Sequence, residues 1–82
     1  METTKKRKLT RGDKKLAKRI RGLRIKQGLT QEKLSVLLGA NPSYIAYIET
    51  HRRGLSLPML YKVAKILDVP VAKLFEDKNV NG

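Results

Sequence analysis

The chain contains no cysteine, and this absence excludes several kinds of scaffold and site at once. Without cysteine there is no disulfide framework, no thiolate zinc site and no cysteine nucleophile. A domain of at most 82 residues buries only a modest fraction of its surface. The disulfides and thiolate zinc sites that often stabilise such small proteins are missing. The sequence therefore predicts that stability comes from a compact helical core or from a partner.

Histidine and acidic residues are also scarce. His51 is the only histidine, and the seven Asp and Glu residues are scattered along the chain. One histidine with scattered acids makes neither a metal site nor a catalytic pair, so we interpret His51 as a loop residue or a helix C-cap. We expect no enzymatic activity, no metal, no cofactor and no small-molecule ligand.

A long apolar segment is missing as well. The longest stretch without charge is residues 34–48, fifteen residues that are interrupted by Gly39, Asn41 and Pro42. A membrane-spanning helix needs roughly 20 apolar residues. The basic start of the chain is followed by no apolar run, so it is not a signal peptide. These features predict a soluble, cytoplasmic protein.

Positive charge, by contrast, is abundant and unevenly placed. The formal net charge is +12, and residues 1–26 hold twelve Lys or Arg against two acids. Arg52 and Arg53 form a second, smaller focus. Clustered cations at this density are typical of a nucleic-acid-binding protein, although a solubilising tail on an ordinary domain would look similar.

The spacing of apolar residues predicts an all-α fold. Apolar residues recur three and four positions apart, and no segment alternates apolar and polar residues long enough to form a strand. Gly28 and Gly39 are expected to end the first two helices as left-handed C-caps. We expect five helices, and they begin near Asp13, Thr30, Asn41, Ser56 and Val71.

The ends of the chain carry no helical pattern. We expect residues 1–12 to form a disordered basic N-terminal arm, residues 13–77 the folded domain, and residues 78–82 a frayed tail.

Residues 30–49 have the pattern of a helix-turn-helix, two short helices joined by Leu-Gly-Ala-Asn at 38–41. Gly39 suits the turn, and Ser35 supplies a small residue where the helices cross. The residues expected to face the core are Leu34, Leu37, Leu38, Ile45 and Ile48. The residues expected to face outward on the second helix are Ser43, Tyr44, Ala46 and Tyr47.

This pattern lies within a longer one. Gly-Leu-Thr-Gln-Glu-Lys-Leu (28–34), Ser-Tyr-Ile (43–45) and Ala-Lys-Ile-Leu-Asp-Val (64–69) follow one another in the chain. Together with Ile20, Leu23, Arg24, Gly39, the Ile-Glu pair at 48–49 and the Leu-Phe pair at 74–75, they resemble the Cro/C1-type (XRE) family of DNA-binding repressor domains. The resemblance covers about residues 16–75. It implies a compact five-helix lambda-repressor-like DNA-binding domain whose third helix lies in the major groove.

Two residues depart from the family pattern. His51 stands where the family usually has glycine, and Leu55 stands where proline is favoured. We expect Gly54 to take over the special backbone conformation of this loop.

The third helix, expected over residues 41–50, would present its outward positions to base edges. Pro42 offers only apolar contact, Ser43 discriminates weakly, and Tyr47 could reach a base edge or a phosphate. None can make the bidentate contacts of Arg, Asn or Gln, so we expect modest direct readout and specificity from DNA shape, paired half-sites and the arm. The expected base-contacting residues are Pro42, Ser43, Ala46 and Tyr47.

A larger set of residues is expected to contact the DNA backbone, which positions the protein without reading sequence. Asn41 can also serve only as a helix cap, and Arg52 and Arg53 only as a solvated loop. The cluster at 5–8 also resembles a short nuclear-import signal; as an arm it would add salt-dependent, non-specific affinity. The expected backbone contacts are Gln31, Asn41, Tyr44, Arg52, Arg53, Lys5, Lys6, Arg7 and Lys8.

The resemblance also implies a partly buried ion pair between Arg24 and Glu49 that braces the third helix. Since no second catalytic group lies near Glu49 in the pattern, we interpret this acid as structural.

The function that these observations favour is a sequence-specific, double-stranded DNA-binding transcriptional regulator, a repressor that acts as a homodimer on a two-fold symmetric operator. Two alternatives stay open: an antitoxin that binds both its operator and a toxin protein, and an adaptor or RNA-associated protein that reuses the fold. The candidate dimer residues can equally be core, and for Phe75 we expect core. These candidates are Leu55, Leu57, Val69, Val71 and Phe75.

Overall fold

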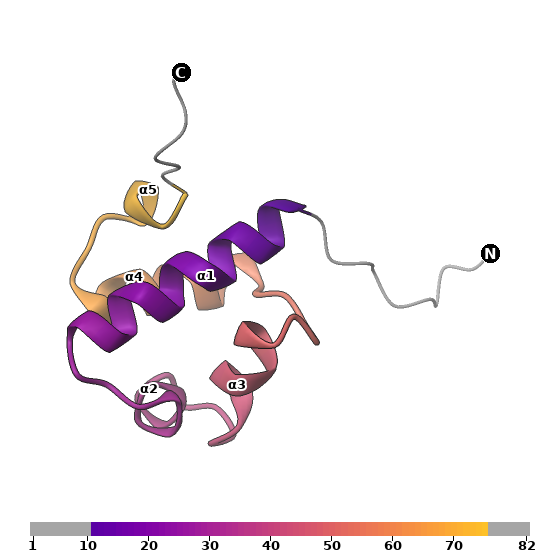
Figure 1. The fold of residues 1–82 in the computed structure, drawn as a ribbon. Coiled ribbons are helices and arrows are strands. Elements are labelled where there is room, and N and C mark those ends of the chain that lie inside the picture. Colours follow the sequence, from indigo (N-terminus) through magenta and orange to yellow (C-terminus); the bar gives the residue numbers. More distant parts are fainter. Residues whose placement is uncertain (1–10, 76–82) are drawn as a thin grey trace.

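The structure is a computed structural model that describes residues 11–75, with side chains from Asp13 onward. Five helices follow one another in this range: α1 (Arg11–Lys26), α2 (Gln31–Leu37), α3 (Tyr44–Glu49), α4 (Leu57–Leu67) and α5 (Val71–Leu74) (Figure 1). Residues 11–75 contain no strand, so the predicted all-α, five-helix fold is confirmed. Helix α1 begins at Arg11, two residues before the expected start at Asp13. The cluster at 5–8 and the tail at 78–82 lie outside the described residues.

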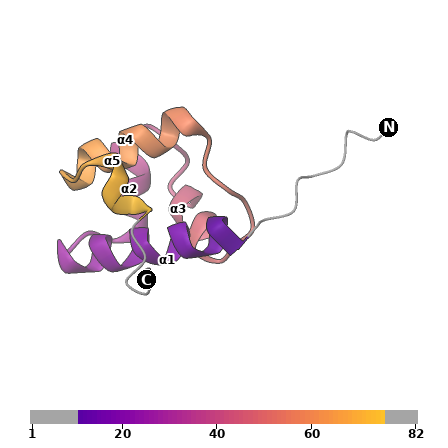
Figure 2. The same ribbon diagram turned by 90° about the horizontal axis from the view of Figure 1, so that it is seen from above.

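The helices are arranged around α1. In Figure 1, α4 lies behind α1, while α2 and α3 lie on one side of it and α5 on the other. The second view separates α1 and α4 into opposite layers (Figure 2). Helix α3 packs against both α1 and α2, and α5 packs against both α1 and α4. The helix-turn-helix formed by α2 and α3 therefore lies against one side of α1, which is the longest helix.

One hydrophobic core joins these layers. Every described helix contributes to it, because the three-four spacing places apolar side chains on the inner face of each. The large apolar side chains that are completely or almost completely buried are Ile20, Leu34, Ile45, Ile48, Val63, Leu67 and Leu74. Across residues 11–75, no helix is long and apolar enough to span a membrane.

Each of the first four helices is followed, one or two residues after its last residue, by a residue with positive φ. These residues are Gly28 (74°), Gly39 (76°), His51 (63°) and Asp68 (59°). At Gly28, the amide of Leu29 donates to the carbonyl oxygen of Arg24 at 3.0 Å, which closes the helix end as a Schellman motif. The predicted C-caps at the two glycines are confirmed. At the other two ends, residues with a side chain occupy a backbone region that favours glycine.

Two predictions about the core are wrong. Leu37 is 48% exposed, because the inner face of α2 is centred between Leu34 and Ser35, and Leu37 lies more than a quarter-turn away from it. Phe75 is 59% exposed, because the short α5 points Leu74 into the core and the next residue turns away.

Candidate nucleic-acid interface

Ser35 links α2 to α3. Its side chain is completely buried, and its hydroxyl donates to the carbonyl oxygen of Gln31 at 2.8 Å. The same oxygen accepts the amide N–H of Ile45 at 2.9 Å. The residue is thus small enough for the helices to cross closely, as predicted, and its hydroxyl also links them. This link was not predicted.

The turn between the two helices is closed by the backbone. Gly39 donates to the carbonyl oxygen of Val36 at 2.9 Å, and Ala40 donates to that of Ser35 at 3.0 Å. This pairing requires a left-handed residue at Gly39, where a residue with a Cβ would be strained. The angle between α2 and α3 is therefore set by the turn and by Ser35 together.

The start of the third helix differs from the prediction. Regular α-helix runs over Tyr44–Glu49, not over the expected 41–50. The amide of Tyr44 donates to the carbonyl oxygen of Asn41 at 2.8 Å, which makes residues 42–43 a tighter turn ahead of the helix. The Oδ1 atom of Asn41 accepts the N–H of Ser43 at 2.9 Å and its hydroxyl at 2.8 Å. Asn41 therefore caps this turn through Oδ1, and its contact with a phosphate stays a prediction.

The four residues expected to contact bases lie on the outer side of this turn and helix. Pro42 is exposed, Ser43 and Ala46 are half-buried, and Tyr47 is 45% exposed. Since the hydroxyl proton of Ser43 points to Asn41, Ser43 can only accept a hydrogen bond from a base. The surface carries no charge of its own. Contact with bases stays a prediction.

Tyr44 does not face outward as expected, because its ring is buried in the core. The guanidinium carbon of Arg53 lies 5.0 Å from the ring centre, a cation–π contact that holds the loop after α3 against the start of that helix. Burial raises the pKa of Tyr44 above its usual 10.0, and Arg53 opposes this in part. The hydroxyl is therefore protonated at neutral pH. Its contact with a phosphate is an untested prediction.

Arg24 and Glu49 form the ion pair that the resemblance implied. The Nε atom of Arg24 lies 2.8 Å from Oε2 of Glu49, and its Nη2 atom donates to Oε1 at 2.9 Å. The remaining Nη1 atom donates to the carbonyl oxygen of Leu29 at 2.7 Å. Both charged side chains are almost completely buried. This bidentate pair fixes α3 to α1.

Gln31 takes part in the same network. Its Nε2 atom donates to Oε1 of Glu49 at 2.9 Å, so the amide that was expected to hold a phosphate is also oriented by the acid. The amide has a second N–H beside this one, and contact of Gln31 with a phosphate stays a prediction. Arg52 and Arg53 are exposed beside α3, as expected for backbone contacts.

The expectation for the loop after α3 is wrong. His51, not Gly54, adopts the left-handed conformation, with φ of 63°. His51 donates to the carbonyl oxygen of Ile48 at 3.1 Å, and Arg52 donates to that of Tyr47 at 2.8 Å. The loop therefore keeps the geometry that the glycine of the family pattern would allow, and His51 carries the strain.

Some residues of the site were missed from the sequence. Lys14, Lys15, Lys18 and Arg21 of α1 line a hollow beside the end of α3. These cations were not among the expected contact residues, although 14, 18 and 21 have the spacing of one helix face. Gln27 was also missed: its amide donates to the carbonyl oxygen of Leu67 at 2.6 Å and ties α1 to the end of α4. Within residues 11–75, no group of three or more His, Cys, Asp or Glu could hold a metal ion.

A helix-turn-helix family model, HTH_3, matches residues 20–74. The chain belongs to this family. It is a DNA-binding transcriptional regulator of the Cro/C1 (XRE) type, and this part of the prediction is confirmed. A relative described as an uncharacterized HTH-type transcriptional regulator of Archaeoglobus fulgidus is 35% identical over 57 residues, 70% of this chain and 81% of that protein.

Solved structures of similar fold include two regulators. The restriction-modification controller protein C.AhdI from Aeromonas hydrophila is 38% identical, with a TM-score of 0.72, and the match covers 77% of this chain and 96% of that one. SinR, a master regulator for biofilm formation solved in complex with DNA, is 31% identical, with a TM-score of 0.68 over 74% of this chain and 98% of its own.

Proposed function

We propose that this XRE-type regulator is a repressor that binds a specific double-stranded DNA sequence with the start of α3 in the major groove. The observation that carries the proposal is the uncharged outer surface of residues 42–47, held at a fixed angle to α2 by the hydroxyl of Ser35. Two exposed cations, Arg52 and Arg53, follow in the loop directly after α3. An apolar and hydroxyl-bearing surface with cations beside it suits a groove that is bordered by phosphates.

We assign the residues of this surface either to base edges or to phosphates, according to the hydrogen-bonding groups that each can offer to DNA. Pro42, Ser43, Ala46 and Tyr47 meet base edges, whereas Gln31, Asn41, Tyr44, Arg52 and Arg53 meet phosphates. None of the base-facing residues makes a bidentate contact, so much of the specificity comes from DNA shape and from two half-sites read together. The cluster at 5–8 adds affinity that depends on salt.

We propose that the two half-sites are bound by a homodimer. Leu57 (61% exposed) and Tyr61 (56%) lie four residues apart on the outer face of α4, and Phe75 is similarly exposed after α5. Among the earlier candidates, Leu55, Val69 and Val71 pack partly against the core, so they are weaker candidates than Leu57 and Phe75. Exposed aromatic and aliphatic side chains of this kind favour an interface between copies. The protein would act with the DNA in the cytoplasm.

A binding comparison tests the proposal. The full chain is titrated against a selected duplex, a random duplex and single-stranded RNA over a series of salt concentrations. The proposal predicts that the selected duplex binds most tightly and that its preference survives higher salt, because base and shape readout are less screened than phosphate contacts. Equal affinity for all three would remove the repressor and support the adaptor or RNA-associated alternative.

A further inference from the structure

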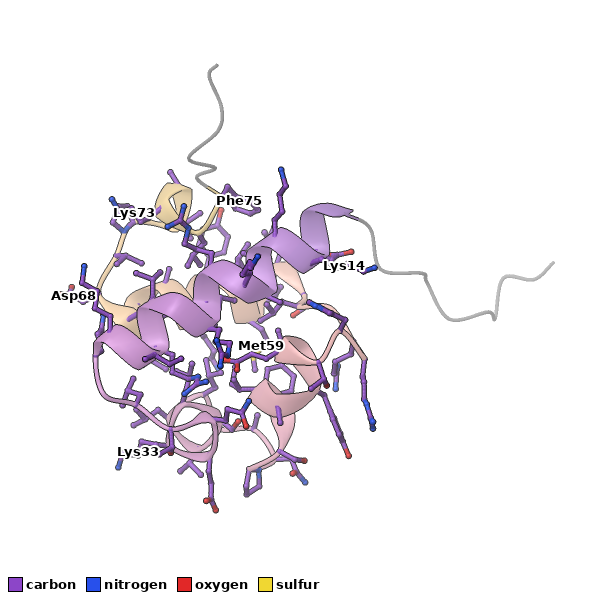
Figure 3. All side chains as sticks on the ribbon, viewed as in Figure 1. Lys14, Lys33, Met59, Asp68, Lys73 and Phe75 are labelled. Atoms are coloured by element: carbon purple, nitrogen blue, oxygen red, sulfur yellow. The ribbon has the colours of Figure 1, made fainter. Side chains whose placement is uncertain are left out.

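A hollow of about 360 Å³ lies between residues 14–21 of α1 and the end of α3. Figure 3 shows Lys14 at the N-terminal end of α1. Neither the predicted base contacts nor the predicted phosphate contacts include a residue of this hollow. Its lining residues, which we call the basic hollow, are Lys14, Lys15, Ala17, Lys18, Arg21, Glu49 and His51.

The basic hollow has an excess of positive charge that its one acid does not neutralise. Glu49 already receives two hydrogen bonds from Arg24, at 2.8 and 2.9 Å. Arg21 lies 3.9 Å from the same carboxylate and its side chain is largely exposed, a geometry that contributes little. Glu49 is therefore engaged mainly by Arg24, and Lys14 and Lys18 add two positive charges to the hollow.

The spacing of these cations is unfavourable for the helix alone. Lys14 and Lys18 are four residues apart and Arg21 is three further on, so the three share one face of α1. Like charges at this spacing destabilise a helix. An anion bound between them removes this repulsion and adds charge-assisted hydrogen bonds. Lysine and arginine side chains are common donors to phosphate in proteins.

We propose that the basic hollow is a phosphate-binding site. The phosphate belongs either to the DNA backbone or to a small phosphorylated molecule, and the ligand chemistry is the same in both cases. His51 of the hollow is followed directly by Arg52 and Arg53, so the hollow adjoins two residues that are proposed above to contact phosphates. The DNA source rests on the function proposed above, whereas the small-molecule source does not.

The first arm of the test uses free anions. Backbone amide resonances of the full chain are followed during titration with inorganic phosphate and with pyrophosphate, against sodium chloride of equal ionic strength. A phosphate site gives saturable shifts centred on Lys14, Lys18, Arg21 and His51. The shifts are lost in Lys14→Gln/Lys18→Gln and kept in the charge-matched control Lys26→Gln/Lys65→Gln, whose lysines lie at the ends of α1 and α4.

The second arm uses duplex DNA. If Lys14 and Lys18 each neutralise a backbone phosphate, the double variant lowers the slope of log K against log salt by about 1.8, since each contact contributes about 0.9. The control pair leaves the slope near that of the wild type. Thermal melting of both double variants in chloride shows that each is folded.

The two arms separate the outcomes. Saturable shifts with an unchanged slope support a small phosphorylated ligand, and a lowered slope supports the DNA backbone. The phosphate site is overturned if the wild-type protein gives no saturable shifts that depend on Lys14 and Lys18 and the folded double variant keeps the wild-type slope. If the wild-type protein does not bind duplex DNA at all, the function proposed above fails. The titration with free anions then decides alone whether the hollow binds phosphate.

Discussion

Arg24 of α1 and Glu49 of α3 are joined by two hydrogen bonds of 2.8 and 2.9 Å inside the domain. The acid also accepts the side-chain amide of Gln31 at 2.9 Å, so one carboxylate connects the three helices that carry the interface. Glu49 itself is not expected to contact DNA, but it holds in place the surface that is expected to do so.

Replacement of Glu49 by alanine leaves the buried guanidinium of Arg24 without its partner. We expect Glu49→Ala to lower the free energy of unfolding by about 3–5 kcal/mol, because removal of one member of a buried pair leaves an uncompensated charge. Urea denaturation measures the loss. Glu32→Ala, which removes an exposed acid of α2, is the matched control and should change stability little. An unchanged midpoint for Glu49→Ala would refute a bracing role.

Replacement of Ser35 by alanine keeps a small residue at the helix crossing but removes the hydroxyl that accepts the N–H of Ile45. We expect a loss of about 1–3 kcal/mol, the cost of a buried donor without an acceptor. Ser43→Ala, which removes an oxygen at the surface, should cost much less. Equal stability of wild type and Ser35→Ala in chemical denaturation would mean that the hydroxyl does not link the helices.

Replacement of His51 by glycine should stabilise the protein. His51 has φ of 63°, where a side chain is strained, and glycine relieves the strain at the cost of a more flexible unfolded chain. We expect a gain of about 0.5–1 kcal/mol by differential scanning calorimetry and urea denaturation. Gly54→Ala should have little effect, because Gly54 is not in the left-handed region. A destabilised His51→Gly protein would show that the side chain makes contacts worth more than the strain.

Tyr44 should make stability depend on pH in the alkaline range. Burial raises its pKa in the folded protein, so the folded state favours the neutral phenol more than the unfolded state does. Its contribution is complete below the ordinary value of 10.0 and is lost as pH rises through the raised pKa. Urea denaturation from pH 8 to 11 should show a fall that is smaller in Tyr44→Phe than in wild type. The exposed Tyr61→Phe is the control; an identical fall in all three proteins would contradict the burial of Tyr44.

The general arrangement was predictable because it depends on local chemistry. The glycines at 28 and 39, the caps at Thr30 and Ser56 and the apolar spacing mark the helices directly, and Thr30 and Ser56 each accept the expected backbone N–H. The ion pair of Arg24 and Glu49 followed only from the family resemblance, because 25 residues separate them and no local pattern pairs them.

The errors arose where a side chain's direction depends on distant packing. The pattern of α3 alone made Tyr44 an outward residue, but its ring is buried and lies under Arg53 of the following loop. The spacing of the leucines in α2 predicted that Leu37 faces the core. Because α3 packs against the side of α2 that carries Ser35, Leu37 instead faces away from the core. The basic hollow was invisible for the same reason, since it forms only where α1 meets the end of α3.

The central claim is that the outer surface of residues 42–47 reads a specific duplex. Selection of bound sites from random double-stranded DNA, performed with wild type and with Tyr47→Ala, tests it most directly. We predict that wild type enriches a two-fold symmetric sequence bound at least about a thousandfold more tightly than random duplex. Tyr47→Ala should change the preferred bases at positions related by the two-fold axis. Failure of the wild-type protein to enrich any sequence would contradict the account.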